Sequence, residues 1–221
     1  MSEKRRALIV HGGWDGHEPA AFADHYATVL RSEGFEVEVS DTLDALRDSD
    51  ALRRLSLIVP IWTMGTIEPE QLQPLQEAVA AGVGLAGFHG GMGDAFRTAT
   101  DFQLMVGGQF VGHPDGIKDY DVTIVDRESP VTRGLADFAV TSEQYYMHVD
   151  PSNEVLATTT FHPSSAPWAE GVVMPVVWTR RWGAGYVFYS SLGHSTTELA
   201  VPEVGEIQRR GMLWAARWED A

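Results

Sequence analysis

Residues 83–91 read VGLAGFHGG, an apolar run that ends in a histidine flanked by glycines. Many α/β enzymes present a reactive side chain in this way, at the tip of a sharp turn between a buried strand and a helix. The tip residue is usually Ser or Cys, and here it is His89. Glycines permit the sharp reversal and the strained backbone of such a turn. The stretch predicts an α/β fold with a functional imidazole, the alternative being a histidine that caps a turn by bonding to the backbone.

Segments on the N-terminal side of this turn alternate between apolar runs and helical patterns. Expected strands and helices, in chain order, are a strand at 6–10, a helix at 18–34, strands at 35–39 and 55–62, a helix at 69–82 and a strand at 83–89. Continuous apolar strands that alternate with helices indicate a parallel sheet covered on both faces.

After Asp121 the pattern changes to strand-like segments and ends in one helix. The expected elements are strands at 121–125, 154–160, 174–179 and 184–191, a hairpin turn at 181–185, and a helix at 201–218. One face of that helix carries Ile207, Gly211, Trp214 and Trp218, which indicates that it packs on the sheet. No repeat or linker interrupts the chain, so we expect a single domain over residues 1–221.

The composition narrows the class of protein. Sixteen basic and 31 acidic residues give a net charge of −15, whereas nucleic acids and anionic membranes need clustered basic side chains, so we expect neither as a partner. The absence of cysteine excludes disulfides, thiolate metal sites and cysteine nucleophiles, and it fits a reducing compartment. The apolar run near the N-terminus is too short for a signal peptide or membrane span, so we expect a cytoplasmic protein.

Several of the eight histidines follow predicted strands, where open parallel sheets bind their ligands. His17 lies beyond the first strand, His89 ends the fourth and His194 follows the last strand. His113 lies in the Gly-rich stretch GGQFVGHPDG, and Glu143 precedes two tyrosines. An ordinary loop residue is the alternative for His113, and a solvated carboxylate at a strand start is the alternative for Glu143. If the predicted fold is right, these side chains converge on one pocket.

Other side chains are candidates for substrate binding. Arg97 follows the Gly-rich turn and suits an anionic or polyhydroxylated ligand, although a surface salt bridge is equally open. Flat or polar-tipped aromatic side chains commonly stack on sugar rings, but most tryptophans belong to cores. The aromatic candidates near the expected mouth are Trp62, Tyr145, Tyr146 and Trp178. The chain contains no Walker loop, no G-x-G-x-x-G after the first strand, no G-x-S-x-G and no H-E-x-x-H motif.

Six motifs, taken in order, resemble the ThuA-like family, which is named for a trehalose-utilisation protein. They are HGGWDGH (11–17), GVGLAGFHGG (82–91), GGQFVGHP (107–114), SEQYY (142–146), MPVVWTRRWGAGYVFYSSLGH (174–194) and RRGMLWAARW (209–218). The resemblance implies a flavodoxin-like, three-layer fold of the class I glutamine amidotransferase type, with a mostly parallel sheet and helices on both faces. It places His89 at the position of the amidotransferase cysteine and His194 near that of the amidotransferase histidine. It also carries over His17, His113, Glu143 and Tyr145.

Without cysteine, glutamine hydrolysis through a thioester is excluded. The family resemblance instead implies carbohydrate utilisation, with trehalose or oxidised (3-keto) sugars as substrates. Imidazole is a common ligand of zinc, copper, iron and nickel, so a divalent metal such as zinc bound by His17, His89, His113 and His194 is one hypothesis. The other is metal-free acid–base catalysis by His89 and His194, with Glu143 as a base or as an orienting group.

The sequence does not determine the class of reaction. An isomerase, lyase or hydrolase acting on a sugar derivative is the first hypothesis. A non-catalytic sugar-binding or regulatory protein on the same fold is the alternative, since fold alone does not settle function. We expect a small-molecule sugar as the partner, and a homo-oligomer is compatible with the sequence.

Overall fold

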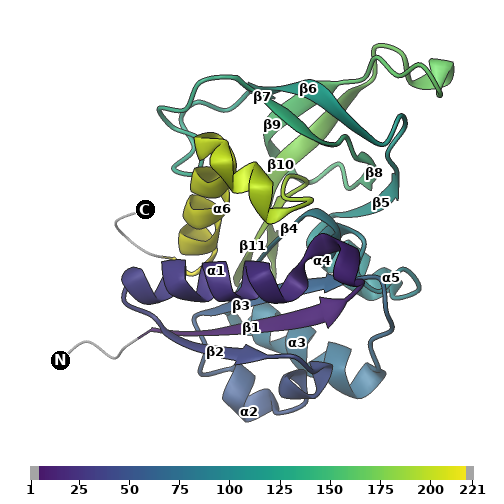
Figure 1. The fold of residues 1–221 in the computed structure, drawn as a ribbon. Coiled ribbons are helices and arrows are strands. Elements are labelled where there is room, and N and C mark those ends of the chain that lie inside the picture. Colours follow the sequence, from purple (N-terminus) through teal and green to yellow (C-terminus); the bar gives the residue numbers. More distant parts are fainter. Residues whose placement is uncertain (1–4, 218–221) are drawn as a thin grey trace.

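The computed structural model describes residues 5–217. Its main sheet has nine strands in the order β2-β1-β3-β4-β11-β10-β9-β6-β7 (Figure 1). The first five pair in parallel and the rest pair antiparallel, so the sheet is mixed. The parallel part consists of β1 (Arg6–Gly13), β2 (Glu36–Ser40), β3 (Leu57–Thr63), β4 (Gly84–Phe88) and β11 (Gly185–Ser190). The antiparallel part consists of β10 (Val173–Trp182), β9 (Glu154–Thr160), β6 (Ile117–Ile124) and β7 (Phe138–Glu143).

Both faces of the central parallel strands are buried, whereas β2 at the edge is more exposed. In β1, Ala7 and Ile9 belong to one hydrophobic cluster and Leu8 and Val10 to the other. Successive strand residues point to opposite faces, so a continuous apolar run is what a strand covered on both sides requires. The expected α/β architecture with helices on both faces is confirmed.

The helices supply the two covers. One cluster contains buried residues of α1 (Pro19–Ser32) and α6 (Pro202–Ala215), and the other contains those of α3 (Pro69–Ala81) and α5 (Thr100–Val106). Two short helices are α2 (Ser49–Leu52) and α4 (His89–Gly93). Helix α6 approaches the sheet closely because Gly211 has no side chain, and a Cβ there would lie 2.3 Å from the ring of Phe188. The expected contact of Trp218 falls outside the described residues.

Three strands are not anticipated from the sequence. β5 (Gly108–Gly112) and β8 (Tyr146–Val149) form a separate two-stranded sheet, and β7 forms the edge of the main sheet. The stretch 107–116, expected to be a loop, is therefore partly a strand, and Glu143 lies at a strand end instead of a strand start. In Figure 1 these antiparallel elements lie above the parallel strands, with α4 near the junction. In the part of the chain described, no helix is long and apolar enough to cross a membrane.

Candidate metal centre

His89 occupies the tip of a strained turn, as its sequence context predicts. It follows β4 and begins α4 with a φ of 47°, a left-handed conformation that is uncommon outside glycine. The hydroxyl of Tyr189 donates a 2.9 Å hydrogen bond to the carbonyl oxygen of His89, which fixes the turn from the neighbouring strand. A Cβ at Gly90 would lie 2.6 Å from Nδ1 of His17. Glycine is therefore needed where the turn meets the loop of the first strand.

The hydrogen bonds of His89 determine which nitrogen faces the site. Its Nδ1 lies 2.8 Å from the carbonyl oxygen of Ser191, which can only accept, so Nδ1 carries the proton. The other nitrogen, Nε2, lies 3.2 Å from Oε2 of Glu143. In a neutral imidazole Nε2 carries a lone pair, and that lone pair faces a carboxylate oxygen. A proton or a cation is needed between them.

Two more imidazoles approach the same carboxylate oxygen. Nε2 of His17 lies 3.7 Å and Nδ1 of His194 lies 3.3 Å from Oε2 of Glu143. One nitrogen from each of the three imidazoles and a carboxylate oxygen lie within 4.8 Å of one another. We call His17, His89, Glu143 and His194 the four-residue cluster. Its members come from the ends of β1, β4, β7 and β11, which is where the sheet topology predicts a site.

Side chains from neighbouring loops and strands hold the cluster together. Nδ1 of His17 lies 2.9 Å from the hydroxyl of Thr63, at the end of β3. Glu18, next to His17, accepts hydrogen bonds of 2.8 Å from the backbone N–H and the hydroxyl of Thr196. This contact joins the loop of His17 to the loop of His194. The ring of Tyr145 stacks on His89, with 4.1 Å between ring centroids.

Glu198 holds the backbone on the other side of His194. Its carboxylate accepts hydrogen bonds from the backbone N–H of Gly193 (2.8 Å) and His194 (3.1 Å), and from the hydroxyl of Ser142 (2.6 Å). Burial raises the pKa of Glu198, while these hydrogen bonds act to lower it. Sequence reasoning missed Glu198, Thr63 and Ser191. Only Glu198 leaves a trace in the sequence, as the carboxylate of GHSTTE, because Ser191 acts through its backbone.

The electrostatics hold Glu143 and His89 in the protonation states that ligate metals, whereas the hydrogen bond with Glu143 raises the pKa of His194. Burial acts to raise the pKa of Glu143, but the imidazoles of His17, His194 and His89 outweigh it and hold that pKa well below its usual range. Burial lowers the pKa of His89 to about 4, although Glu143 acts to raise it. The cluster therefore pairs an ionised carboxylate with a neutral His89, and metal ligands must be deprotonated in this way.

The donor set fits a divalent transition metal. Among the described residues, Nε2 of His17 and Nδ1 of His194 are buried without a hydrogen-bond partner. Buried polar atoms are rarely left unpaired, so each of these two needs an explanation. Two ligand atoms on one tetrahedral zinc ion lie about 3.3–3.5 Å apart. The distances from Oε2 of Glu143 to His89 (3.2 Å) and His194 (3.3 Å) are close to this value.

His113, which the sequence grouped with the ligands, lies differently. Its Nε2 is 3.6 Å from Oε1 of Glu143, whereas the contacts of the other three histidines are to Oε2. Its side chain is 38% exposed, against 1% for His89. The structure therefore leaves His113 outside the four-residue cluster and on its solvent-facing side.

The aromatic residues that were expected to bind substrate lie in different surroundings. Trp178 is fully buried and donates to the carbonyl oxygen of Val106, so the expectation that it stacks on a ligand is wrong. Tyr146 instead contacts the rings of Phe161 and Trp168.

Two further candidates lie at the ends of strands or turns. Arg97 forms a two-pronged ion pair with the buried Asp94, at 2.6 and 2.8 Å, which is the salt bridge that the sequence left open. Trp62 is partly buried beside Gly12, and Gly12 could not carry a Cβ without meeting its ring.

A surface hollow of about 350 Å³ meets the cluster at His194. Its lining includes the apolar side chains of Ile117, Val140 and Val201. It also includes the hydroxyl groups of Thr141, Ser195 and Thr197. Such a mixture can accept a ligand with both apolar and hydroxyl-bearing surfaces beside the cluster.

The chain was compared with a family model, with curated protein sequences and with solved structures. The search of curated sequences finds no match. A ThuA-like protein of Bacteroides uniformis ATCC 8492 has a similar structure (TM-score 0.77, 19% identity, 96% of this chain and 91% of that chain). So does a ThuA-like protein of Parabacteroides merdae ATCC 43184 (TM-score 0.75, 18% identity, 97% and 90%). A cytoplasmic protein of Salmonella typhimurium LT2 is more distant (TM-score 0.65, 14% identity, 97% and 98%). Residues 6–215 match the family described as ThuA, trehalose utilisation, and the chain belongs to that family.

Proposed function

We propose that this protein is an enzyme of carbohydrate utilisation that binds a divalent transition metal through His17, His89, Glu143 and His194. One observation carries the proposal, the convergence of three imidazole nitrogens on Oε2 of Glu143, two of them buried and unpaired. A metal bound there would supply a Lewis acid for a sugar carbonyl or activate a water molecule. Imidazole-rich sites suit zinc, copper, iron and nickel, and zinc is our first candidate.

We assign proton transfer to His113. Among the described histidines near Glu143 it has the most exposed side chain, and an imidazole within reach of a substrate can act as a general acid or base. In a keto-sugar, the C–H proton beside the ketone would pass to the imidazole. It would return to a carbon in an isomerisation, or to the departing glycosidic oxygen as the C–O bond breaks in an elimination. His89 is too buried to touch a substrate, which argues for a ligand role.

The substrate class rests on the family and on the hollow at His194. Membership of a family described by trehalose utilisation supports a sugar, and the mixed lining of the hollow supports a ligand with hydroxyl groups. The net charge of −15 argues against nucleic acid as the partner. A cysteine-free sequence fits a reducing compartment, so the proposal includes a cytoplasmic location.

Metal content and turnover test the proposal together. The protein is purified without a histidine tag, and its metal content is measured for wild type, Glu143→Gln and the surface control His25→Ala. We expect about one metal per chain in wild type and control, and little in Glu143→Gln. Turnover of a panel of 3-keto-glycosides is then compared between wild type and His113→Asn. We expect His113→Asn to keep its metal and lose 10²- to 10⁴-fold in rate, the usual range for an acid–base group.

Two outcomes would overturn the proposal. A wild-type protein that neither retains nor takes up a transition metal contradicts the metal centre. Saturable binding of keto-glycosides without turnover by the metal-loaded protein would favour a sugar-binding or regulatory protein on the same fold.

A further inference from the structure

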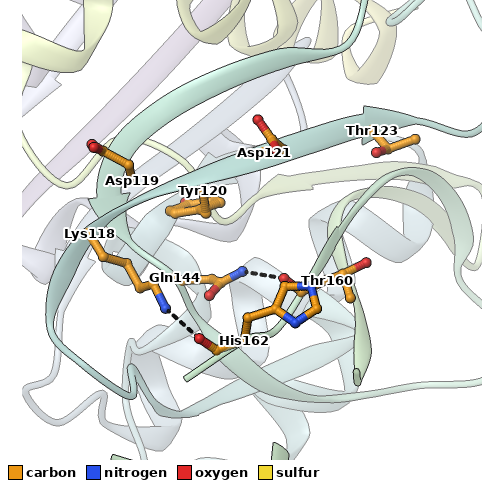
Figure 2. A pocket seen from close by; sticks show the side chains of 8 residues that line it. All are labelled: Lys118, Asp119, Tyr120, Asp121, Thr123, Gln144, Thr160 and His162. Carbon is orange, nitrogen blue, oxygen red and sulfur yellow. Dashed lines mark hydrogen bonds between the residues drawn. The ribbon is translucent and has the colours of Figure 1, made fainter. Parts of the chain in front are cut away.

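A second hollow, of about 470 Å³, opens where β6 separates from β9 (Figure 2). The two strands pair only at Thr123 with Thr158 and at Ile124 with Ala157, so the first part of β6 runs free of β9. None of the lining residues belongs to the four-residue cluster, although Gln144 directly follows Glu143. The volume is within the range of small-molecule sites, about 300–1,000 Å³.

Gln144 carries an unpaired acceptor in this hollow. The residue is 1% exposed, and its Nε2 donates to the hydroxyl of Thr159 (2.8 Å) and the carbonyl oxygen of Thr160 (3.2 Å). The hydroxyl of Thr159 already donates to the carbonyl oxygen of Asp121, at 2.8 Å. The hydroxyl oxygen of Thr159 and the carbonyl oxygen of Thr160 therefore both accept a hydrogen bond from Gln144. Only the amide nitrogen can donate, so the nitrogen of the side chain, and not its oxygen, faces them. Figure 2 shows its nitrogen turned toward Thr160.

The remaining amide oxygen, Oε1 of Gln144, is buried and has no hydrogen-bond partner among the described residues. An unsatisfied buried acceptor costs about 1–3 kcal/mol, so a donor is expected there. The nearby ammonium of Lys118 is directed elsewhere, to Asp115 (3.3 Å) and to the carbonyl oxygen of His162 (3.4 Å). The donor must then come from a ligand or from water.

The charges around the hollow define the ligand. The exposed carboxylates of Asp119 and Asp121 line it and oppose an anion, while Lys118 opposes a simple cation. Oε1 of Gln144 and the carboxylates can accept hydrogen bonds, and the ammonium of Lys118, which already donates to Asp115 and His162, has a third N–H to donate. A hydroxyl group is donor and acceptor at once, so several hydroxyls on one neutral molecule satisfy all of these groups.

We infer that this hollow is a second binding site, separate from the metal centre, for a neutral polyhydroxylated ligand of the sugar or polyol class. Oε1 of Gln144 accepts from one ligand hydroxyl, Asp121 accepts from another, and Lys118 donates to a third. This site does not depend on the proposed metal or on catalysis.

The test uses metal-free protein, so that binding at this site is measured without the metal centre. Trehalose, glucose and glycerol are titrated into EDTA-treated full-length protein and followed by calorimetry and ligand-observed NMR. Thr160→Trp fills the hollow with a side chain at its exposed rim but keeps the carbonyl that Gln144 uses. Glu154→Trp places the same ring at the other end of β9 and is the matched control. Gln144→Leu removes the unpaired acceptor.

We expect saturable binding of at least one probe to wild type and to Glu154→Trp. Thr160→Trp and Gln144→Leu should weaken it at least tenfold, and Glu143→Gln should leave it unchanged. Absence of saturable binding for all three probes, or binding that Thr160→Trp does not weaken, overturns the inference. So does a ligand-soaked crystal structure in which only water contacts Oε1 of Gln144. If the wild-type protein binds no metal, this result counts against the proposed function and not against this site.

Discussion

The Nδ1 atom of His89 lies 2.8 Å from the carbonyl oxygen of Ser191, a residue 102 positions later in the chain. This contact fixes the tautomer of the imidazole and turns the lone pair of Nε2 toward Glu143. Outer contacts of this kind orient metal ligands and tune their basicity. The strained turn, with φ of 47° at His89, therefore holds an oriented imidazole against Glu143.

Metal binding should stabilise the folded protein. A metal that binds only the folded state at 100 times its dissociation constant adds about 2.7 kcal/mol. For a chain of this size that corresponds to a rise in Tm of about 5–10 °C. We expect this rise when zinc is added to EDTA-treated wild type or His25→Ala, measured by differential scanning fluorimetry. An equal rise in His89→Ala would show that zinc binds elsewhere.

Glu198 should act on the metal centre through His194. Replacing Glu198 by Gln puts an amide N–H where a carboxylate oxygen accepts from the backbone of Gly193 or His194. We expect about a 10- to 100-fold loss of metal affinity, the usual effect of removing an outer contact of a ligand. Isothermal calorimetry with zinc measures this loss. Ser142→Ala, which leaves both backbone contacts in place, should lose less, and equal affinity in Glu198→Gln and wild type would contradict the role.

Gly90 should be intolerant of even one added methyl group. A Cβ there would lie 2.6 Å from Nδ1 of His17 and 2.9 Å from the hydroxyl of Thr63, so the ring of His17 must move. We expect Gly90→Ala to weaken zinc binding at least tenfold. Gly112→Ala is the control, since nothing lies within 4 Å of a Cβ there. Similar zinc affinity in the two variants would mean that the cluster tolerates a displaced His17.

Glu206 should make stability depend on pH. Hydrogen bonds from Arg209 and Arg210 lower its pKa to about 2. A lowered pKa in the folded state stabilises the protein above the ordinary pKa of 4.5, and this contribution is lost as the pH falls toward 2. The pairs are partly exposed and screened, so we expect Glu206→Gln to cost only about 1 kcal/mol at pH 7.

Urea denaturation at pH 7 and at pH 3 checks this expectation. The difference in unfolding free energy between wild type and Glu206→Gln should shrink at the lower pH. The control Glu203→Gln, on the first turn of the same helix, should show a smaller change. A difference that grows on acidification would show that the sign is wrong.

Much of the fold can be read from local patterns. The run RALIV predicts a strand because it is continuously apolar, and the structure buries Ala7 and Leu8 in two different clusters. Pro19 marks the start of α1, since proline suits a first helical turn. Gly82 marks the end of α3, since glycine suits the position after a helix. In contrast, β5 and β8 are short and mixed in polarity, so their pairing depends on long-range contacts that no local pattern records.

Sequence alone determined that an imidazole stands at the tip of the turn at His89, and that other histidines follow the strand ends where a parallel sheet gathers its loops. It could not distinguish the buried Trp178 from an exposed one, because a tryptophan in a strand suits either place. Tertiary structure decided that Oε2 of Glu143, and not His113, completes the cluster. Ligand geometry depends on distances of a few tenths of an ångström between side chains from distant segments, and only the packed fold sets these distances.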